Sequence, residues 1–132
     1  TLEPLIPFTE KKGIKYIETK PLNFILDEFE INNDVKLELN KVVYNMNQNP
    51  NVKIEINYHT DSRGPDTYNL QLTKNRANST KDYLISKGIN SNRIEANGYG
   101  ETKLLNNCSN NVKCSEEEHS VNRRTEFKVI SN

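Results

Sequence analysis

The chain of 132 residues has the size of one domain, since domains typically contain about 100 to 150 residues. Lysine and arginine together number 18, and so do aspartate and glutamate, which makes the formal net charge zero. This balance disfavours nucleic acid and anionic membrane surfaces as partners, because both attract an extended positive field. No apolar run reaches the roughly 20 residues of a membrane span, so we expect a soluble chain without direct membrane insertion.

The first 20 residues have the marks of a connecting segment. They contain Pro4, Pro7 and the polar run TEKKG, and they show little periodicity before IKYIET. We interpret residues 1–20 as an N-terminal linker or edge extension that ends in an optional edge strand, and residues 21–132 as the domain. Because the chain begins at Thr1, we expect a processed chain or a piece of a longer protein.

Hydrophobic periodicity and turn residues predict six elements within residues 21–132. In chain order they are a buried strand at Asn23–Leu26, a helix at Asp34–Asn47, a strand at 51–58, a helix at Tyr68–Lys87, a strand at 92–98 and a strand at 123–130. The connections are long enough to hold the helices. We therefore predict an α/β sandwich in β-α-β-α-β-β order, with a mixed sheet of about four strands and helices packed on one face.

The predicted helices have recognisable ends and faces. Asn33 is expected to cap the first helix, and Gly88 suits the C-terminal end of the second. The inner stripe predicted for the second helix consists of Thr73, Ala77, Thr80 and Leu84. Ser115 and Glu118 have the spacing of a capping box, so the acidic run there predicts the first turn of a short helix.

Cys108 and Cys114 lie six positions apart in a polar stretch rich in asparagine. A disulfide between them would close a small loop and would imply an oxidising compartment such as the periplasm. The alternatives are a metal-binding pair and two free thiols. Zinc is disfavoured, because the chain has no second cysteine pair and only two histidines.

The sequence contains no convincing catalytic constellation. The stretch YHTDSRG, residues 58–64, places histidine and aspartate close together, but no serine or cysteine stands in a nucleophile-elbow context. GYGE at Gly98–Glu101 lacks the third glycine of a dinucleotide loop and is interpreted as a tight turn. The run Glu116–His119 is interpreted as a capped helical turn rather than a metal site, and the two arginines of NRRTEF, which stand beside Glu126, as members of cross-strand ion pairs. We expect no enzyme, no cofactor and no metal.

Asp61 and Arg76 form the pair best suited to a ligand. Asp61 falls just past the C-terminal end of a strand, where open α/β sheets tend to place ligands. Arg76 lies two turns into the following helix and can lean over the same end of the sheet. A carboxylate and a guanidinium that face one volume suit a ligand with both an ammonium and a carboxylate. On spacing alone, this interpretation and an internal Asp61–Arg76 ion pair remain equally open.

A family resemblance is carried by residues 59–101, which read HTDSRGPDTYNLQLTKNRANSTKDYLISKGINSNRIEANGYGE, and by the later NRRTEF. They resemble the OmpA-like domain, the module shared by OmpA C-terminal regions, peptidoglycan-associated lipoproteins and MotB-type motor proteins. The resemblance covers the chain from about Pro21 to Ile130. It implies a periplasmic, non-catalytic module of an outer-membrane-associated protein that binds peptidoglycan non-covalently through stem-peptide diaminopimelate and anchors its parent to the cell wall. The alternative is a module that docks another envelope protein.

The resemblance also assigns roles to positions. The aspartate of the family's TD motif falls on Asp61 and its helix arginine on Arg76, which would hold the ammonium and the carboxylate of the free D-centre of diaminopimelate. The other ligand-binding positions that it implies are Asn69, Leu72, Thr60, Phe24, Ile25 and Arg124. The segment after GYGE resembles the cysteine-containing variant of the domain, which supports the disulfide between Cys108 and Cys114.

Two positions depart from the family pattern. Ile25 stands where aspartate or asparagine is common, so we expect a backbone or apolar contact there. Tyr58 replaces a common glycine before HTD and is expected to crowd the floor of the site or to stack on the ligand. Arg63 is expected to face solvent. One peptide should bind modestly, because desolvation of both charges offsets much of the gain, and many sites on one polymer would supply tight anchoring.

Overall fold

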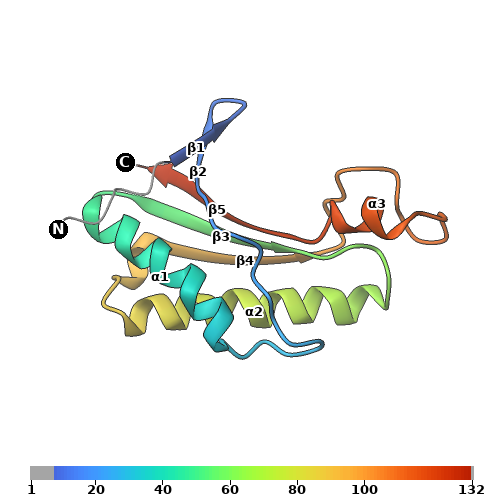
Figure 1. Cartoon of the computed structure of the whole chain (residues 1–132), viewed down its shortest axis with the longest axis horizontal. Coiled ribbons are helices and arrows are strands. Elements are labelled where there is room, and N and C mark those ends of the chain that lie inside the picture. The colour runs from blue at the N-terminus through green and yellow to red at the C-terminus, as the bar shows by residue number, and fades with distance from the viewer. Residues whose placement is uncertain (1–7, 132) are drawn as a thin grey trace.

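The computed structural model describes residues 8–131 of the chain. Its elements are β1 (Phe8–Lys11), β2 (Ile14–Ile17), α1 (Asn33–Gln48), β3 (Lys53–His59), α2 (Asp66–Ser86), the 3-10 helix η1 (Ser91–Arg93), β4 (Ile94–Gly100), α3 (Glu116–Ser120) and β5 (Arg124–Ser131). The strands form one sheet in the order β1-β2-β5-β3-β4, in which β3 and β4 are parallel and the other neighbours are antiparallel. Helices α1 and α2 cover one face of the sheet, and α3 lies at its end (Figure 1).

The predicted fold class, an α/β sandwich with helices on one face of a mixed sheet, is confirmed, but the sheet has five strands rather than about four. The strand predicted at Asn23–Leu26 is wrong, since these residues form a loop that pairs with none of the described strands. The optional edge strand of the N-terminal segment forms β2, and β1 extends the sheet beyond it. Phe24 explains the misleading apolar pattern, because its ring packs edge-on against Tyr58 with centroids 5.8 Å apart.

Apolar stripes on two helices meet one face of the sheet. On α1, the buried apolar residues at helical spacing are Val35, Leu39, Val42 and Met46. The stripe predicted for α2 is confirmed and consists of Thr73, Ala77, Thr80 and Leu84. The sheet contributes Ile54, Ile56, Tyr58 and Phe127 to the same core. Removing these apolar side chains from water supplies the main driving force for folding.

The helix ends follow the predicted cap chemistry with one shift of position. Asn32, rather than Asn33, caps α1, and its Oδ1 accepts the backbone N–H of Val35 at 3.0 Å. The capping box at Ser115 and Glu118 is confirmed, with each side chain accepting the backbone N–H of the other residue at 3.0 to 3.1 Å. Satisfying these N–H groups allows α3 to form although it is only five residues long.

The GYGE motif ends β4 and begins the predicted tight turn, in which the N–H of Thr102 donates to the carbonyl oxygen of Tyr99 at 3.0 Å. Gly98 and Gly100 both lie in β4, where α2 packs directly against the strand backbone. A Cβ added to Gly98 would lie 2.2 Å from the backbone nitrogen of Lys74, so only glycine fits. The N–H of Gly100 donates to Oγ1 of Thr73 at 2.9 Å. This close approach brings the first half of α2 onto the end of the β3–β4 pair, where the predicted site lies.

Candidate functional site

Asp61 lies two residues past the end of β3 and is 5% exposed. Its Oδ1 accepts the backbone N–H of Arg63 at 2.9 Å, which closes a local turn. Its Oδ2 accepts Nη2 of Arg63 at 2.8 Å and Nη1 of Arg123 at 2.7 Å. Burial raises the pKa of Asp61, but the hydrogen bonds from Arg63 and Arg123 outweigh it and lower this pKa to about 2. Asp61 is therefore ionised near neutral pH and is neutralised from two sides.

Glu116 completes a ring of four charges around Asp61. Its Oε2 accepts Nη1 of Arg63 at 2.8 Å, and its Oε1 accepts Nη2 of Arg123 at 2.5 Å. The ring ties the β3–α2 connection to the start of α3 and to the residue before β5. Arg63, predicted to face solvent, has a side chain that is 50% exposed, but its guanidinium bridges two carboxylates.

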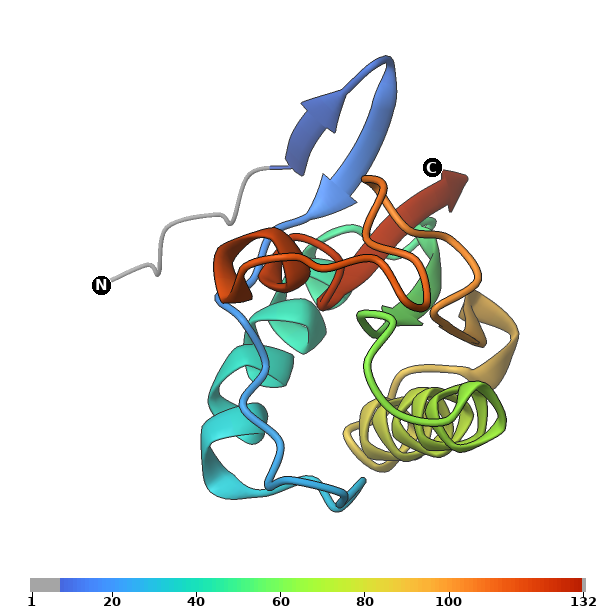
Figure 2. The same cartoon turned by 90° about the vertical axis from the view of Figure 1, so that its right-hand side faces the viewer.

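Arg76 projects from α2 and does not pair with Asp61. Its Nε donates to the carbonyl oxygen of Glu28 at 2.8 Å, and its Nη2 lies 3.4 Å from the carbonyl oxygen of Ile25. Its Cζ lies 4.8 Å from the centroid of the Phe24 ring. These contacts hold the loop between β2 and α1 against α2 (Figure 2). An internal Asp61–Arg76 ion pair is therefore excluded.

Arg76 forms no ion pair among residues 8–131, although the carboxylate of Asp27 acts on its charge from a longer distance. Its side chain is half-buried, and no described carboxylate lies within the 4.0 Å of an ion pair. Burial lowers the pKa of Arg76, although a guanidinium remains charged at any physiological pH. The carbonyl contacts orient this cation but do not neutralise it.

Thr60 and Asn69, two of the predicted site residues, lie close to Asp61. Thr60 is its chain neighbour, and the Thr60 N–H donates to the carbonyl oxygen of Gly100 at 2.8 Å. The Oγ1 of Thr60 is buried and has no hydrogen-bond partner in the described part of the chain. Asn69 is buried on the first turn of α2, and its Nδ2 donates to the carbonyl oxygen of Arg63 at 2.9 Å. Both residues thus shape the backbone around Asp61.

Leu72, Phe24 and Ile25 surround Arg76 instead. Leu72 is half-buried and precedes Arg76 by one turn on the same side of α2. Ile25 is 57% exposed, and its carbonyl oxygen lies 3.4 Å from Nη2 of Arg76. Tyr58 is not available to stack on a ligand, because it is 3% exposed and its hydroxyl lies 2.6 Å from a threonine hydroxyl of α2.

Arg124 lies on the opposite side of the sheet. Side chains alternate along a strand, so Arg124 faces away from the helices while Phe127 faces them. Its Nη2 donates to the carbonyl oxygen of Lys103 at 3.1 Å. The arginine beside Asp61 is Arg123, which the sequence analysis did not select. The same alternation is the signal that could have separated the two arginines.

Of the two arginines for which cross-strand ion pairs were predicted, Arg123 pairs with Asp61 beyond the end of β3, and Arg124 forms no ion pair within residues 8–131. Glu126 contacts Nε2 of His59 at 3.2 Å on the open face of the sheet. His59 also stacks on Tyr99, with ring centroids 5.2 Å apart. The ring of His59 therefore has Glu126 and Tyr99 as its neighbours on the open face of the sheet.

Glu101, which the sequence analysis also missed, forms a carboxyl pair with Asp66 near Asp61. Burial, followed by the hydrogen bond with Asp66, raises the pKa of Glu101 to about 7. The same hydrogen bond lowers the pKa of Asp66. Glu101 therefore holds a proton near neutral pH, and the charge of this corner of the site changes with pH.

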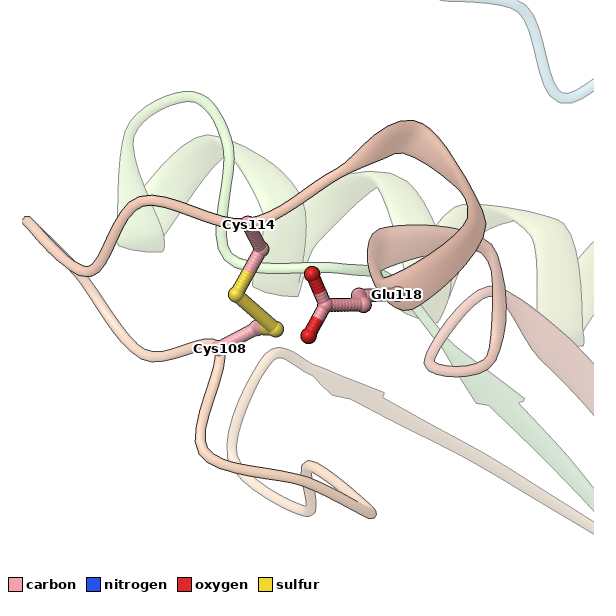
Figure 3. A group of neighbouring side chains, drawn as sticks. All are labelled: Cys108, Cys114 and Glu118. Atoms are coloured by element: carbon pink, nitrogen blue, oxygen red, sulfur yellow. A yellow bond between two sulfur atoms is a disulfide. The ribbon is translucent and has the colours of Figure 1, made fainter.

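Cys108 and Cys114 form the predicted disulfide, and Glu118 lies beside it (Figure 3). Within residues 8–131, these three side chains are the group whose ligand atoms lie close enough together to hold a metal ion. The two sulfurs are bonded to each other and so cannot act as thiolate ligands. The cluster is a structural crosslink, and neither the metal pair nor the free thiols are adopted.

Comparison with known proteins places this geometry in a family. Residues 23–118 match the model of the OmpA family. A peptidoglycan-associated lipoprotein of Rhizobium meliloti is 36% identical over 101 residues, which cover 76% of this chain and 54% of that protein. Outer membrane porin F of Pseudomonas fluorescens is 39% identical over 84 residues, 64% of this chain and 24% of the porin.

A solved structure shares the fold. The periplasmic domain of Helicobacter pylori MotB matches with a TM-score of 0.69 at 23% identity, over 96% of this chain and 88% of that one. The chain spans between 14% and 58% of the length of the curated relatives that it matches. No helix within residues 8–131 is long and apolar enough to cross a membrane. The lipoprotein and the porin are named for association with peptidoglycan and for a pore rather than for a catalytic activity, which agrees with the predicted non-catalytic domain. From the match over residues 23–118, the chain belongs to the OmpA family.

Proposed function

We propose that this domain binds peptidoglycan non-covalently through the diaminopimelate residue of the stem peptide. It would thereby anchor an outer-membrane-associated parent protein to the cell wall from the periplasm. The observation that carries this proposal is the half-buried charge of Arg76, which forms no ion pair within residues 8–131 and lies on the helix that follows the buried carboxylate of Asp61. Membership of the OmpA family and a relative named as peptidoglycan-associated support it.

Arg76 supplies the anion-binding half of the site. A guanidinium has five N–H donors, and two of those of Arg76 point to the carbonyl groups of Glu28 and Ile25. The remaining donors can grip a ligand carboxylate, which would neutralise a cation that burial has partly deprived of water. Phe24 and Leu72 provide apolar surface beside it for the methylene chain of the ligand.

Asp61 supplies the cation-binding half of the site, but a ligand ammonium must first displace one of the arginines that already contact Asp61. Its Oδ2 already accepts hydrogen bonds from Arg63 and Arg123, whereas its Oδ1 accepts only the backbone N–H of Arg63. The Arg63 side chain is 50% exposed, so displacing its guanidinium by a ligand ammonium costs little. Contacts of opposite sign, held in fixed orientation, then select one configuration of the ligand's stereocentre.

The affinity for one peptide is modest because both charges lose water on binding, and tight attachment arises from many sites on one polymer. The wall-binding unit corresponds to residues 21–132. Residues 1–20 serve as a linker or edge extension, and their hairpin of β1 and β2 lengthens the sheet.

Co-sedimentation with purified sacculi tests the proposal. Arg76→Ala and Asp61→Asn should each abolish pelleting, and Arg76→Lys should retain only part of it because the planar fork is lost. Lys74→Ala, which removes an exposed positive charge from the same helix, is the matched control and should pellet like the wild type. Thermal unfolding of each variant checks that the fold persists. If Arg76→Ala and Asp61→Asn both still pellet, the proposal is wrong.

Docking of another envelope protein is the second candidate. It is favoured by apolar side chains exposed on the loop that Arg76 holds, namely Ile25 at 57%, Leu26 at 84% and Phe29 at 42%. Titration with a stem tripeptide separates the two functions. Absence of any heat or spectral shift at millimolar tripeptide would favour protein docking over wall binding.

A further inference from the structure

The disulfide between Cys108 and Cys114 belongs to a closed circuit of contacts that passes through Asp61. Ser62, the residue after Asp61, donates a short hydrogen bond from its hydroxyl to the carbonyl oxygen of Cys108. Cys108 is bonded to Cys114, which stands two positions before Glu116. Glu116 is joined back to Asp61 by the two arginines of the charge ring. The crosslink and the ligand site are therefore parts of one connected structure.

The two ends of α3 are held by different contacts. At its end, Nδ2 of Asn106 donates to the carbonyl oxygen of Glu118 at 2.8 Å, and the fully buried Asn122 donates to Oδ1 of Asn106 at 2.9 Å. The start of α3 is tied to the rest of the domain by the disulfide and by the ion pairs of Glu116. Loss of the disulfide should therefore loosen the start of α3 while its end stays attached.

The ion pairs of Glu116 are exposed, so their strength depends on how well their members are held. The side chains of Glu116, Arg63 and Arg123 are 62%, 50% and 42% exposed. Exposed pairs contribute little when long side chains must first be ordered to form them. A crosslink that fixes the backbone beside Glu116 removes part of this entropic cost before the pairs form. The disulfide thus favours the arrangement in which Glu116 bridges both arginines.

Glu116 makes Asp61 more accessible to a cation in two ways. The ring of two carboxylates and two guanidinium groups has no net charge, whereas loss of the Glu116 charge would leave it positive and less favourable to an ammonium. Glu116 also engages Nη1 of Arg63 and Nη2 of Arg123, so part of each guanidinium is directed away from Asp61. Both effects weaken the competition that a ligand ammonium meets at Asp61.

We propose that Glu116 is a positioning residue of the ligand site and that the disulfide between Cys108 and Cys114 holds it in place. Glu116 does not touch the ligand. It acts through Arg63 and Arg123 and so sets the affinity of Asp61 for the ammonium of the stem peptide. The inference rests on the proposed function, because it concerns how strongly that same site binds.

Isothermal titration of the domain with the free stem tripeptide at low ionic strength tests the role of Glu116. Glu116→Gln should bind about fivefold more weakly than the wild type, the equivalent of one exposed ion pair. Glu116→Asp keeps the charge and should recover part of this loss. At about 1 M salt the difference between Glu116→Gln and the wild type should nearly vanish, because exposed charges are then screened. A purely structural defect would not respond to salt in this way.

The matched control is Glu117→Gln. It removes an exposed glutamate from the same turn of α3, but Glu117 belongs to none of the ion pairs in the described part of the chain. Glu117→Gln should therefore bind the tripeptide like the wild type. An equal loss in both variants would assign the effect to overall charge and overturn the inference.

Removing the disulfide should reproduce the effect of Glu116→Gln. The double variant Cys108→Ala with Cys114→Ala should also bind about fivefold more weakly, and adding Glu116→Gln to it should cause little further loss. Thermal melts check that each protein is folded at the temperature of titration. Glu116→Gln alters one exposed side chain, so its result stands even where the disulfide variant does not fold.

The outcomes separate this inference from the proposed function. Wild-type affinity in Glu116→Gln or in a folded disulfide variant overturns the inference and leaves tripeptide binding at Asp61 and Arg76 intact. Losses that multiply in the triple variant would show that the disulfide and Glu116 act separately, which also overturns it. Absence of tripeptide binding by the wild type rejects both the inference and the proposed function.

Discussion

Arg123 and Asp61 lie 62 positions apart in the chain, and Nη1 of Arg123 donates to Oδ2 of Asp61 at 2.7 Å. Arg63 donates to the same oxygen at 2.8 Å. Asp61 is therefore a buried anion whose charge is already matched by two arginines before a ligand binds. Binding of a cation at Asp61 is an exchange of partners, and the exposed arginine side chains control it.

Replacing Arg63 tests this exchange. Arg63→Ala removes the competitor for Oδ2, so the stem tripeptide should bind up to about fivefold more tightly, the equivalent of one exposed ion pair. Isothermal titration at constant ionic strength measures the change. Arg63→Lys, which keeps a competing charge, should stay near the wild-type affinity. Weaker binding by Arg63→Ala would mean that Arg63 itself holds the ligand.

Asp61 should make stability depend on acid pH. Its pKa is about 2 in the folded chain against 3.8 for the unperturbed group, so the unfolded state binds the proton more readily. Ionised Asp61 contributes about 2 kcal/mol to the free energy of unfolding. This contribution is fully present above pH 4 and is lost as the pH falls through the folded-state pKa of about 2. Urea unfolding between pH 2 and pH 6 should show a steeper loss of stability toward acid pH in the wild type than in Asp61→Asn, because other carboxylates with lowered pKa values remain in both proteins. Equal pH slopes for the two proteins would refute the assignment.

Glu101 should have the opposite dependence. Burial and the hydrogen bond to Asp66 raise its pKa from 4.5 to about 7, so the folded state binds its proton more tightly than the unfolded state does. Stability should therefore fall as the pH rises from 4.5 to 7, and Glu101→Gln should remove this fall. Thermal melts across that range measure the difference. Parallel melting curves for wild type and variant would show that Glu101 does not hold the proton.

Gly98 should tolerate no side chain. An added Cβ would lie 2.2 Å from the backbone of α2, which cannot move without breaking the contact with β4. Gly98→Ala should therefore lower the free energy of unfolding by about 3 kcal/mol or more. Gly88→Ala is the comparison, since a Cβ there meets nothing within 4 Å and only the positive φ is unfavourable. Its cost should be about 1 kcal/mol, and equal losses at the two positions would contradict the packing argument.

Local patterns in the sequence determined most of the elements. The helix at Asp34–Asn47, the longer helix with its buried stripe and the strands at 51–58 and 123–130 were all predictable, because side-chain periodicity is a property of the segment itself. The capping box of α3 was predictable for the same reason. The strand predicted at Asn23–Leu26 failed, because an apolar loop that packs a ring onto the core has the same local pattern as a strand.

The sequence also predicted that Asp61 follows a strand and that Arg76 lies on the next helix, because the strand and the helix were both recognisable from their local periodicity. Only the tertiary structure decided which groups neutralise Asp61. In the antiparallel β3–β5 pair, His59 stands opposite Arg124, and this register carries Arg123 past the end of β3 to the side of Asp61. A register between strands far apart in the chain is set by the packing of the whole sheet, so no local pattern in the sequence encodes it.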